Sequence, residues 1–131
     1  MILLDTHVLL WWLENDKHLS LRARSVIEQE RKSGEIAVSS ISVWEICMLI
    51  KGGRLNLARD IETWINDLEA VPFLQITPVN HQMMQSAVFL PEPFHKDPAD
   101  RIIVATALRL GVPLVTGDAK IRGYRHVRTV W

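Results

Sequence analysis

The stretch His95–Lys120, HKDPADRIIVATALRLGVPLVTGDAK, decides the expected fold. Asp97 suits the N-cap of a helix because its carboxylate can accept the free amide protons of the first turn, and Pro98 suits the first helical position. The apolar run IIVATAL continues this helix, and Gly111 ends it. Asp100 is therefore expected in the first helical turn.

A short strand is predicted after this helix, and a second acid follows it. Pro113–Thr116 is typical of a short buried strand, and Asp118 lies just beyond its C-terminal end. In an open α/β sheet, ligands bind in the crevice outside the carboxyl ends of the strands, and helices that follow strands begin there too. Asp100 and Asp118 are therefore expected to reach one pocket.

Short apolar runs alternate with helical patterns along the rest of the chain. The other predicted strands are Ile2–Leu4, Ile36–Val38, Leu74–Thr77 and Val127–Trp131. The other predicted helices run from about Ser20 to Lys32, Ser42 to Lys51, Leu57 to Ala70 and Asn80 to Leu90, with a short helix capped by Thr6 and a helical turn around Ile121. This alternation favours βαβ units, a mostly parallel sheet and one α/β domain over residues 1–131.

Composition limits the classes of function. Lys+Arg and Asp+Glu are equal at 15 each, so any nucleic-acid contact must rest on a local patch or on metal ions. The single Cys47 excludes an internal disulfide and a cysteine-built zinc site. The start MILLDTH lacks a basic n-region, and no apolar run reaches the roughly eighteen residues needed to span a bilayer. We therefore expect a cytoplasmic protein with no membrane contact.

Two further acids are expected at the same crevice. Asp5 ends the first strand, and Glu45 has the capping-box spacing from Ser42. Each acid alone has an ordinary structural role, but together they would repel strongly. Two unit charges about 5 Å apart at an effective dielectric of roughly 20 repel by about 3 kcal/mol, and a domain is stable by only about 5 to 15 kcal/mol. Such a cluster must take up protons or bind cations.

The candidate ligands are all carboxylate oxygens. No His or Cys pair has the HExxH or CxxC spacing, so the expected ions are Mg²⁺ or Mn²⁺ and not zinc. Divalent ions can hold a phosphodiester, lower the pKa of a water that attacks phosphorus and stabilise the departing oxyanion. The chemistry predicted from the acids is metal-assisted phosphodiester hydrolysis.

Four motifs also resemble a known family. The motifs MILLDTHVLLWWL, SSISVWEICMLIKGGRL, HKDPADRIIVATAL and PLVTGDAKI, in this order, are similar to those of PIN-domain ribonucleases of the VapC type, the toxins of type II toxin–antitoxin pairs. The resemblance implies a three-layer sandwich with about five mostly parallel strands, Mg²⁺-dependent endoribonuclease activity and a homodimer. It also implies a cognate antitoxin whose C-terminal segment blocks the groove.

Matching motif by motif assigns roles to individual residues. The metal-binding and catalytic acids fall on Asp5, Glu45, Asp100 and Asp118, and Thr116 would orient the last acid or a metal-bound water. Supporting roles fall on Asp97, as the N-cap, on Thr6 beside Asp5, and on Arg101, which is expected in a salt bridge more than on a phosphate.

Neighbouring side chains receive structural interpretations. His7 and His95 lie near the motifs, but hydrolysis with two metals needs no histidine base. Trp11 and Trp12 are interpreted as core packing with one partly exposed ring, in preference to a base-stacking platform. Phosphate contacts would come from basic residues if these surround the crevice: Lys51, Arg54, Lys96, Lys120, Arg122 and Arg125.

Other functions remain open at this point. A receiver-like module would accept a phosphoryl group on an aspartate, with Thr116 and Lys120 nearby, although Asp5 lacks the neighbouring acid expected there. A catalytically silent PIN-like RNA-binding protein is a second alternative. A DNA nuclease shares the same metal chemistry, whereas a DxD phosphatase is disfavoured because His7 stands where its second acid belongs. The preferred RNA, the antitoxin, the dimer surface and the number of metals are not predicted.

Overall fold

The computed structural model describes all 131 residues, arranged as five strands and seven helices. The strands are β1 (Ile2–Leu4), β2 (Ile36–Ser39), β3 (Leu74–Thr77), β4 (Leu114–Val115) and β5 (Thr129–Val130). The helices are α1 (Thr6–Leu13), α2 (Leu21–Ser33), α3 (Ser40–Lys51), α4 (Ile61–Glu69), α5 (His81–Val88), α6 (Pro98–Leu110) and α7 (Ala119–Arg122). None of these helices has both the length and the apolar character needed to cross a membrane.

The five strands form one parallel sheet in the order β3-β2-β1-β4-β5. The chain starts at the centre, builds outward through β2 and β3, and then returns to the other side of β1 with β4. Leu3 of β1 pairs with Ala37 on one side and Leu114 on the other. The strand order therefore reverses between β1 and β4, which is where a ligand crevice forms in such sheets.

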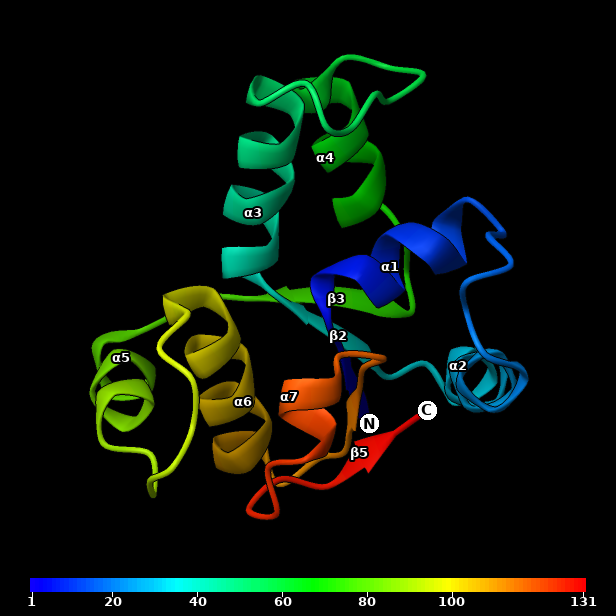
Figure 1. The fold of residues 1–131 in the computed structure, drawn as a ribbon. Coiled ribbons are helices and arrows are strands. Elements are labelled where there is room, and N and C mark those ends of the chain that lie inside the picture. Colours follow the sequence, from blue (N-terminus) through cyan, green and yellow to red (C-terminus); the bar gives the residue numbers. More distant parts are fainter.

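Helices cover both faces of the sheet, as Figure 1 shows. Because side chains of a strand alternate between faces, Ile2 and Leu4 pack into one core with α1, α2, α3 and α4, while Leu3 packs into a second core with α5, α6 and α7. The predicted three-layer α/β sandwich is thus confirmed.

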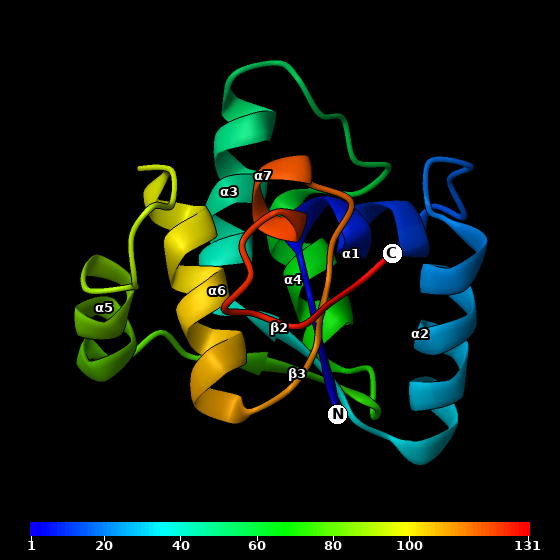
Figure 2. The ribbon, with the colours of Figure 1, turned by 60° about the horizontal axis from the view of Figure 1, so that its bottom comes forward.

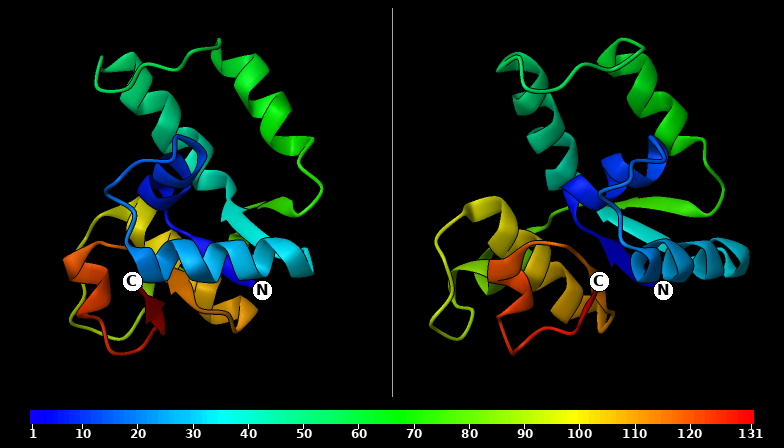
Figure 3. Two further views of the ribbon diagram at one scale, coloured as in Figure 1. Left: turned by 90° about the vertical axis from the view of Figure 1, so that its right-hand side faces the viewer. Right: turned by 45° about the vertical axis from the view of Figure 1, so that its right-hand side comes forward.

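The helices differ in how closely they follow the sheet. Figure 2 shows α5 and α6 side by side and α2 at the opposite end of the molecule. Figure 3 shows α3 and α4 extending together away from the other elements, joined at their far ends by residues 52–60. Helices α1 and α3 follow β1 and β2 almost directly, so their N-terminal ends lie at the C-terminal edge of the sheet.

Most predicted elements lie where expected, and the differences are at their ends. The helix predicted from Leu57 begins only at Ile61, because Asp60 caps it through the amide of Thr63. The first helix is capped by Asp5 and not by Thr6. The third helix begins two residues before the predicted Ser42, with Ser39 as its N-cap.

Candidate active site

Five acids line one cavity of about 400 Å³ at the C-terminal ends of β1 and β4. The four acids predicted as metal ligands are all among them. The full lining is Asp5, Glu45, Asp97, Asp100, Asp118, His7, Val8, Trp11 and Gly117. No Lys or Arg contributes to this lining, so none of the basic residues considered as phosphate contacts lies in the acidic pocket itself.

Another hollow is larger but lacks such chemistry. It has a volume of about 560 Å³, and its lining comes mainly from α5 and α6. Arg109 is the one charged residue in that lining, and its guanidinium donates to the hydroxyl of Ser86 at 3.1 Å. The concentration of acids therefore distinguishes the smaller pocket.

Asp5 is the buried centre of the acidic pocket. It follows β1 directly and caps α1, and its Oδ1 accepts the amide proton of Thr6 at 2.8 Å. Its Oδ2 accepts the hydroxyl proton of Thr116 at 2.7 Å. Burial raises the pKa of the Asp5 carboxyl, although the Thr116 hydrogen bond opposes this increase by stabilising the carboxylate. Both carboxylate oxygens are thus held in place before any ligand binds.

Glu45 is positioned by two buried hydroxyl groups. The Thr6 hydroxyl donates to Oε1 of Glu45 at 2.5 Å, and the Ser42 hydroxyl lies 2.8 Å from the same Thr6 oxygen. Thr6 has only one hydroxyl proton, so Ser42 must donate to Thr6 when Glu45 is ionised. Burial raises the pKa of Glu45, the Thr6 bond lowers it, and nearby Asp5 and Asp97 raise it further.

The expected capping box at Ser42 is therefore wrong. Ser42 lies inside α3, only 1% exposed, and its hydroxyl contacts Thr6 of α1 and not the start of its own helix. Ser39 provides the N-cap by accepting the Ile41 amide proton at 3.2 Å. The spacing between Ser42 and Glu45 instead places both side chains on the helix face toward α1, because residues three apart share a face.

Asp100 lies in the first turn of α6, as predicted. Asp97 is the N-cap and accepts the Asp100 amide proton at 3.0 Å. Burial raises the pKa of Asp100 to about 7, and the negative charges of Asp5, Asp97, Asp118 and Glu45 add to this increase. The charge of Asp100 thus depends on a compensating cation or proton.

His95 supplies a contact to Asp100 that the sequence did not indicate. Its Nε2 atom is buried without a well-oriented hydrogen bond and lies 3.0 Å from Oδ2 of Asp100. The two side chains form an ion pair only when the imidazole is protonated and the carboxyl of Asp100 is ionised. The imidazole also packs against the ring of Phe94.

Asp118 follows β4 and caps the short helix α7. Its Oδ1 accepts the amide protons of Lys120 at 2.8 Å and Ile121 at 3.1 Å. Its own amide donates to the Thr116 hydroxyl at 3.1 Å, and that hydroxyl donates in turn to Asp5. Thr116 therefore links the acids that follow β1 and β4.

Arg101 lies outside the acidic pocket and ties α5 and the following loop to α6. Its guanidinium donates to the carbonyl oxygens of Ala87, Val88, Phe94 and His95 and to Oε1 of Glu92 at 3.1 Å. The salt bridge expected for Arg101 is thus present, and its contribution to the pocket is to hold the backbone of His95.

The pocket has the chemical groups that bind a divalent cation, but its side chains are not arranged around a single ion. Its oxygen donors are carboxylates, and burial with mutual repulsion raises the pKa of three of them, Asp5, Glu45 and Asp100. No three of the chain's acidic, histidine or cysteine side chains, however, are arranged to hold one ion together. Carboxylates without a cation between them repel, so binding requires the side chains to turn inward.

Comparison with known proteins identifies the family. The family model for the PIN domain matches residues 2–127. The chain is 41% identical to Ribonuclease VapC22 of Mycobacterium tuberculosis over 99% of this chain and 98% of that protein.

Solved structures share the fold at low sequence identity. VapBC2 from Rickettsia felis, bound to a DNA fragment from its promoter, has a TM-score of 0.69 at 16% identity, covering 98% of this chain and 97% of that one. DNA-bound VapBC from Salmonella typhimurium has a TM-score of 0.61 at 19% identity, covering 98% and 95%. Family model, sequence relative and fold agree, and the chain therefore belongs to the PIN-domain family as a relative of the VapC ribonucleases.

Proposed function

We propose that this chain is a Mg²⁺-dependent endoribonuclease that acts as the toxin of a type II toxin–antitoxin pair. The observation that carries the proposal is the single pocket lined by five acids, in a chain that is similar over its whole length to a ribonuclease. The reaction is hydrolysis of an RNA phosphodiester bond. We place it in the cytoplasm, where RNA and an antitoxin would be present.

Asp5, Glu45, Asp100 and Asp118 are the residues that would hold the cation. Their hard oxygen donors favour Mg²⁺, with Mn²⁺ as an alternative. When bound, such a cation supplies positive charge that neutralises the acids and polarises a phosphodiester. The raised pKa of Asp100 supports this assignment, since a nearby cation would favour its ionised form.

The chain's own hydroxyl groups position these acids. Thr116 orients Asp5 and the backbone of Asp118, and Thr6 orients Glu45 while accepting from Ser42. Because all three hydroxyl-bearing residues are buried, their side chains cannot rotate freely into solvent. The chain thus restricts the orientations of the Asp5 and Glu45 side chains in the pocket that they line.

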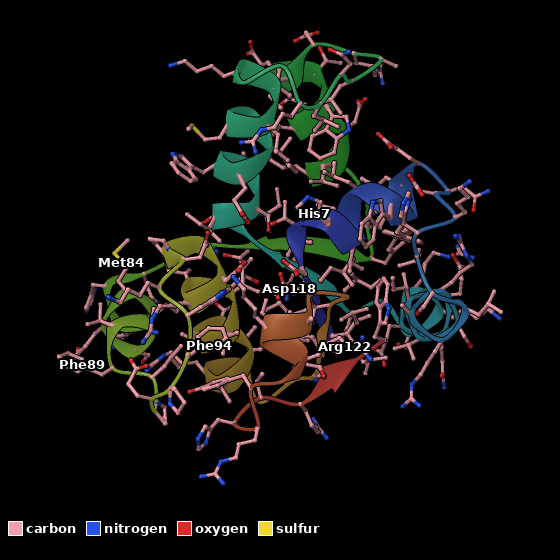
Figure 4. The ribbon with its side chains drawn as sticks, viewed as in Figure 1. His7, Met84, Phe89, Phe94, Asp118 and Arg122 are labelled. Carbon is pink, nitrogen blue, oxygen red and sulfur yellow. The ribbon has the colours of Figure 1, made fainter.

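We also propose two protein partners, a cognate antitoxin and a second copy of the chain. Support for the antitoxin comes from fold relatives whose solved structures are VapBC and FitAB assemblies. Support for a homodimer comes from large apolar side chains exposed on α3 and beside α5. Trp44 is 57% exposed, Met84 52% and Phe89 77%, and Figure 4 shows Met84 and Phe89 at the outer side of α5. Sedimentation velocity of the chain alone tests the dimer.

The decisive experiment is a cleavage assay with a panel of structured and single-stranded RNAs. Purified chain is titrated with Mn²⁺ or Mg²⁺ and compared with Asp100→Asn and with Asp60→Asn, a control at the exposed N-cap of α4. We expect metal-dependent cleavage by the native chain and the control, and loss of cleavage in Asp100→Asn. Cleavage that persists in EDTA, or in an Asp5→Asn variant, would contradict the site.

The same panel separates the alternative functions. RNA binding without cleavage at any metal concentration would indicate a silent PIN-like protein. A single-stranded DNA of the same base sequence tests whether DNA is also cut. A stable acyl-phosphate after incubation with acetyl phosphate, without RNA cleavage, would indicate a phospho-acceptor module. No feature of the pocket specifically supports this alternative.

A further inference from the structure

The side of the acidic pocket formed by α1 is aromatic. His7 and Trp11 line the pocket together with the acids, and their ring centroids lie 5.8 Å apart. Trp11 also contacts the rings of His18 at 5.6 Å and Trp131 at 5.9 Å. Figure 4 shows His7 on the first turn of α1 and Asp118 beside α7, on facing sides of this space. We call these four rings the aromatic wall.

The charge of the pocket makes this wall important for any RNA that reaches it. Five acids and no Lys or Arg line the pocket, so the chain offers an RNA phosphate no attraction there. A cation can neutralise some acids, but it does not select or orient the neighbouring nucleotides. The part of the lining that is not acidic, Val8, Gly117, Trp11 and His7, is what remains to contact a base.

We infer that Trp11, with His7 beside it, forms a stacking subsite for one unpaired nucleobase next to the phosphate that is cleaved. This inference rests on the proposed function, because it names how that site would hold RNA. Unpaired bases in RNA recognition stack on aromatic side chains, and such stacking accepts any base because each has a π-face. Trp11 is then a substrate-contacting residue, and the interpretation of this ring as core packing describes only its buried part.

The rest of the wall holds the Trp11 ring in place. His18 stacks on it with an interplanar angle of 21°, and Asp16 fixes His18 through a 2.7 Å contact to Nδ1. Trp131 packs at 50° to Trp11 and covers Gly117, where an added Cβ would lie 2.8 Å from the Trp131 ring. A base that stacks on Trp11 therefore meets a ring whose orientation is already restricted, which reduces the entropy lost on binding.

Trp12 is the natural control because it is the neighbouring residue with a different environment. Its indole Nε1 donates to Oε1 of Glu28 at 3.3 Å, and its ring packs edge-on against Phe73 at 6.0 Å. It does not line the acidic pocket. Substitutions at Trp11 and Trp12 thus compare an indole in the pocket with an indole outside it.

The test measures binding separately from cleavage. All chains in this measurement carry Asp100→Asn, which prevents cleavage, and the Trp11 and Trp12 substitutions are added to this background. Each chain is titrated in Ca²⁺ with labelled oligo(A) and with an abasic ribose-phosphate oligomer of equal length, and binding is followed by fluorescence anisotropy. Trp11→Leu should weaken oligo(A) binding by about 10- to 100-fold, the range expected for one stacked base. It should leave binding of the abasic oligomer unchanged. Trp11→Phe should restore most of the oligo(A) affinity, and Trp12→Leu should change neither.

A second measurement does not depend on tolerance of leucine. Oligo(A) should quench intrinsic fluorescence in the wild type and in Trp12→Phe, but much less in Trp11→Phe, because the quenched indole is then absent. Equal loss of oligo(A) and abasic binding in Trp11→Leu, or unchanged quenching in Trp11→Phe, would overturn the stacking subsite. Trp11-dependent oligo(A) binding by a wild-type chain that cleaves no RNA would retain the subsite and reject the proposed nuclease.

Discussion

The raised pKa of Asp100 predicts that removing this charge stabilises the metal-free protein. The side chain is 18% exposed, and its pKa increases from 3.8 to about 7. Such a displacement corresponds to at most about 4 kcal/mol between the ionised and protonated forms. Asp100→Asn keeps the shape of the side chain without the charge, so we expect the variant to be more stable than the native chain at pH 8 by up to this amount.

The sign follows from proton binding. Below pH 3.8 the folded and unfolded chains both hold the Asp100 proton, so the native chain bears no cost. Between pH 3.8 and about 7 only the folded chain retains the proton, so its stability falls as the pH rises. Above about pH 7 Asp100 is ionised in both states, and the folded chain bears the full free-energy cost of this buried charge. The stability difference between Asp100→Asn and the native chain should therefore grow across this window and then become constant.

Urea denaturation in EDTA, followed by circular dichroism at pH 5 and pH 8, measures this difference. Asp60→Asn is the control, because Asp60 also lies at the N-terminal end of a helix, as the N-cap of α4, but is outside the pocket and has a lowered pKa. It should leave the pH dependence above pH 4 unchanged. Parallel pH profiles for the native chain and Asp100→Asn would refute the electrostatic account of the pocket. Added Mg²⁺ should stabilise the native chain more than Asp100→Asn, since only the native carboxylate offers a charged ligand.

Three other changes test how the pocket is built. Thr116→Val leaves Oδ2 of buried Asp5 without its donor, so denaturation should show a loss of about 1 to 3 kcal/mol, and a gain in stability would contradict the role of this bond. Gly117→Ala places a Cβ against the Trp131 ring and should cost about 1 to 3 kcal/mol, which Trp131→Ala should partly restore. Ser42→Ala removes the donor to Thr6 and should reduce Mg²⁺ affinity, measured by calorimetry, by about 10-fold, while Ser42→Thr should retain it.

Local sequence patterns predicted much of the fold. The N-caps Ser20, Asn80 and Asp97 and the left-handed Gly111 lie at the expected helix ends, because capping depends on residues within one turn. The capping box predicted at Ser42 was wrong because a local rule considers only residues within one turn of the helix. The sequence contains the S-x-x-E spacing, but it does not indicate that the Ser42 hydroxyl forms a hydrogen bond with Thr6, which lies 36 residues away.

The sequence by itself determined the order of strands and helices and the placement of acids where strands end or helices begin, since these follow from short-range periodicity and backbone capping. The alternation of strands and helices favoured a mostly parallel sheet but not the order of its strands. Only the tertiary structure decided which side chains meet. Thr116 reaches Asp5 across 111 residues, and Trp11 meets Trp131 from the other end of the chain, because β1 lies beside β4 and β4 beside β5. Such contacts depend on how the sheet is assembled, and no local pattern encodes that assembly.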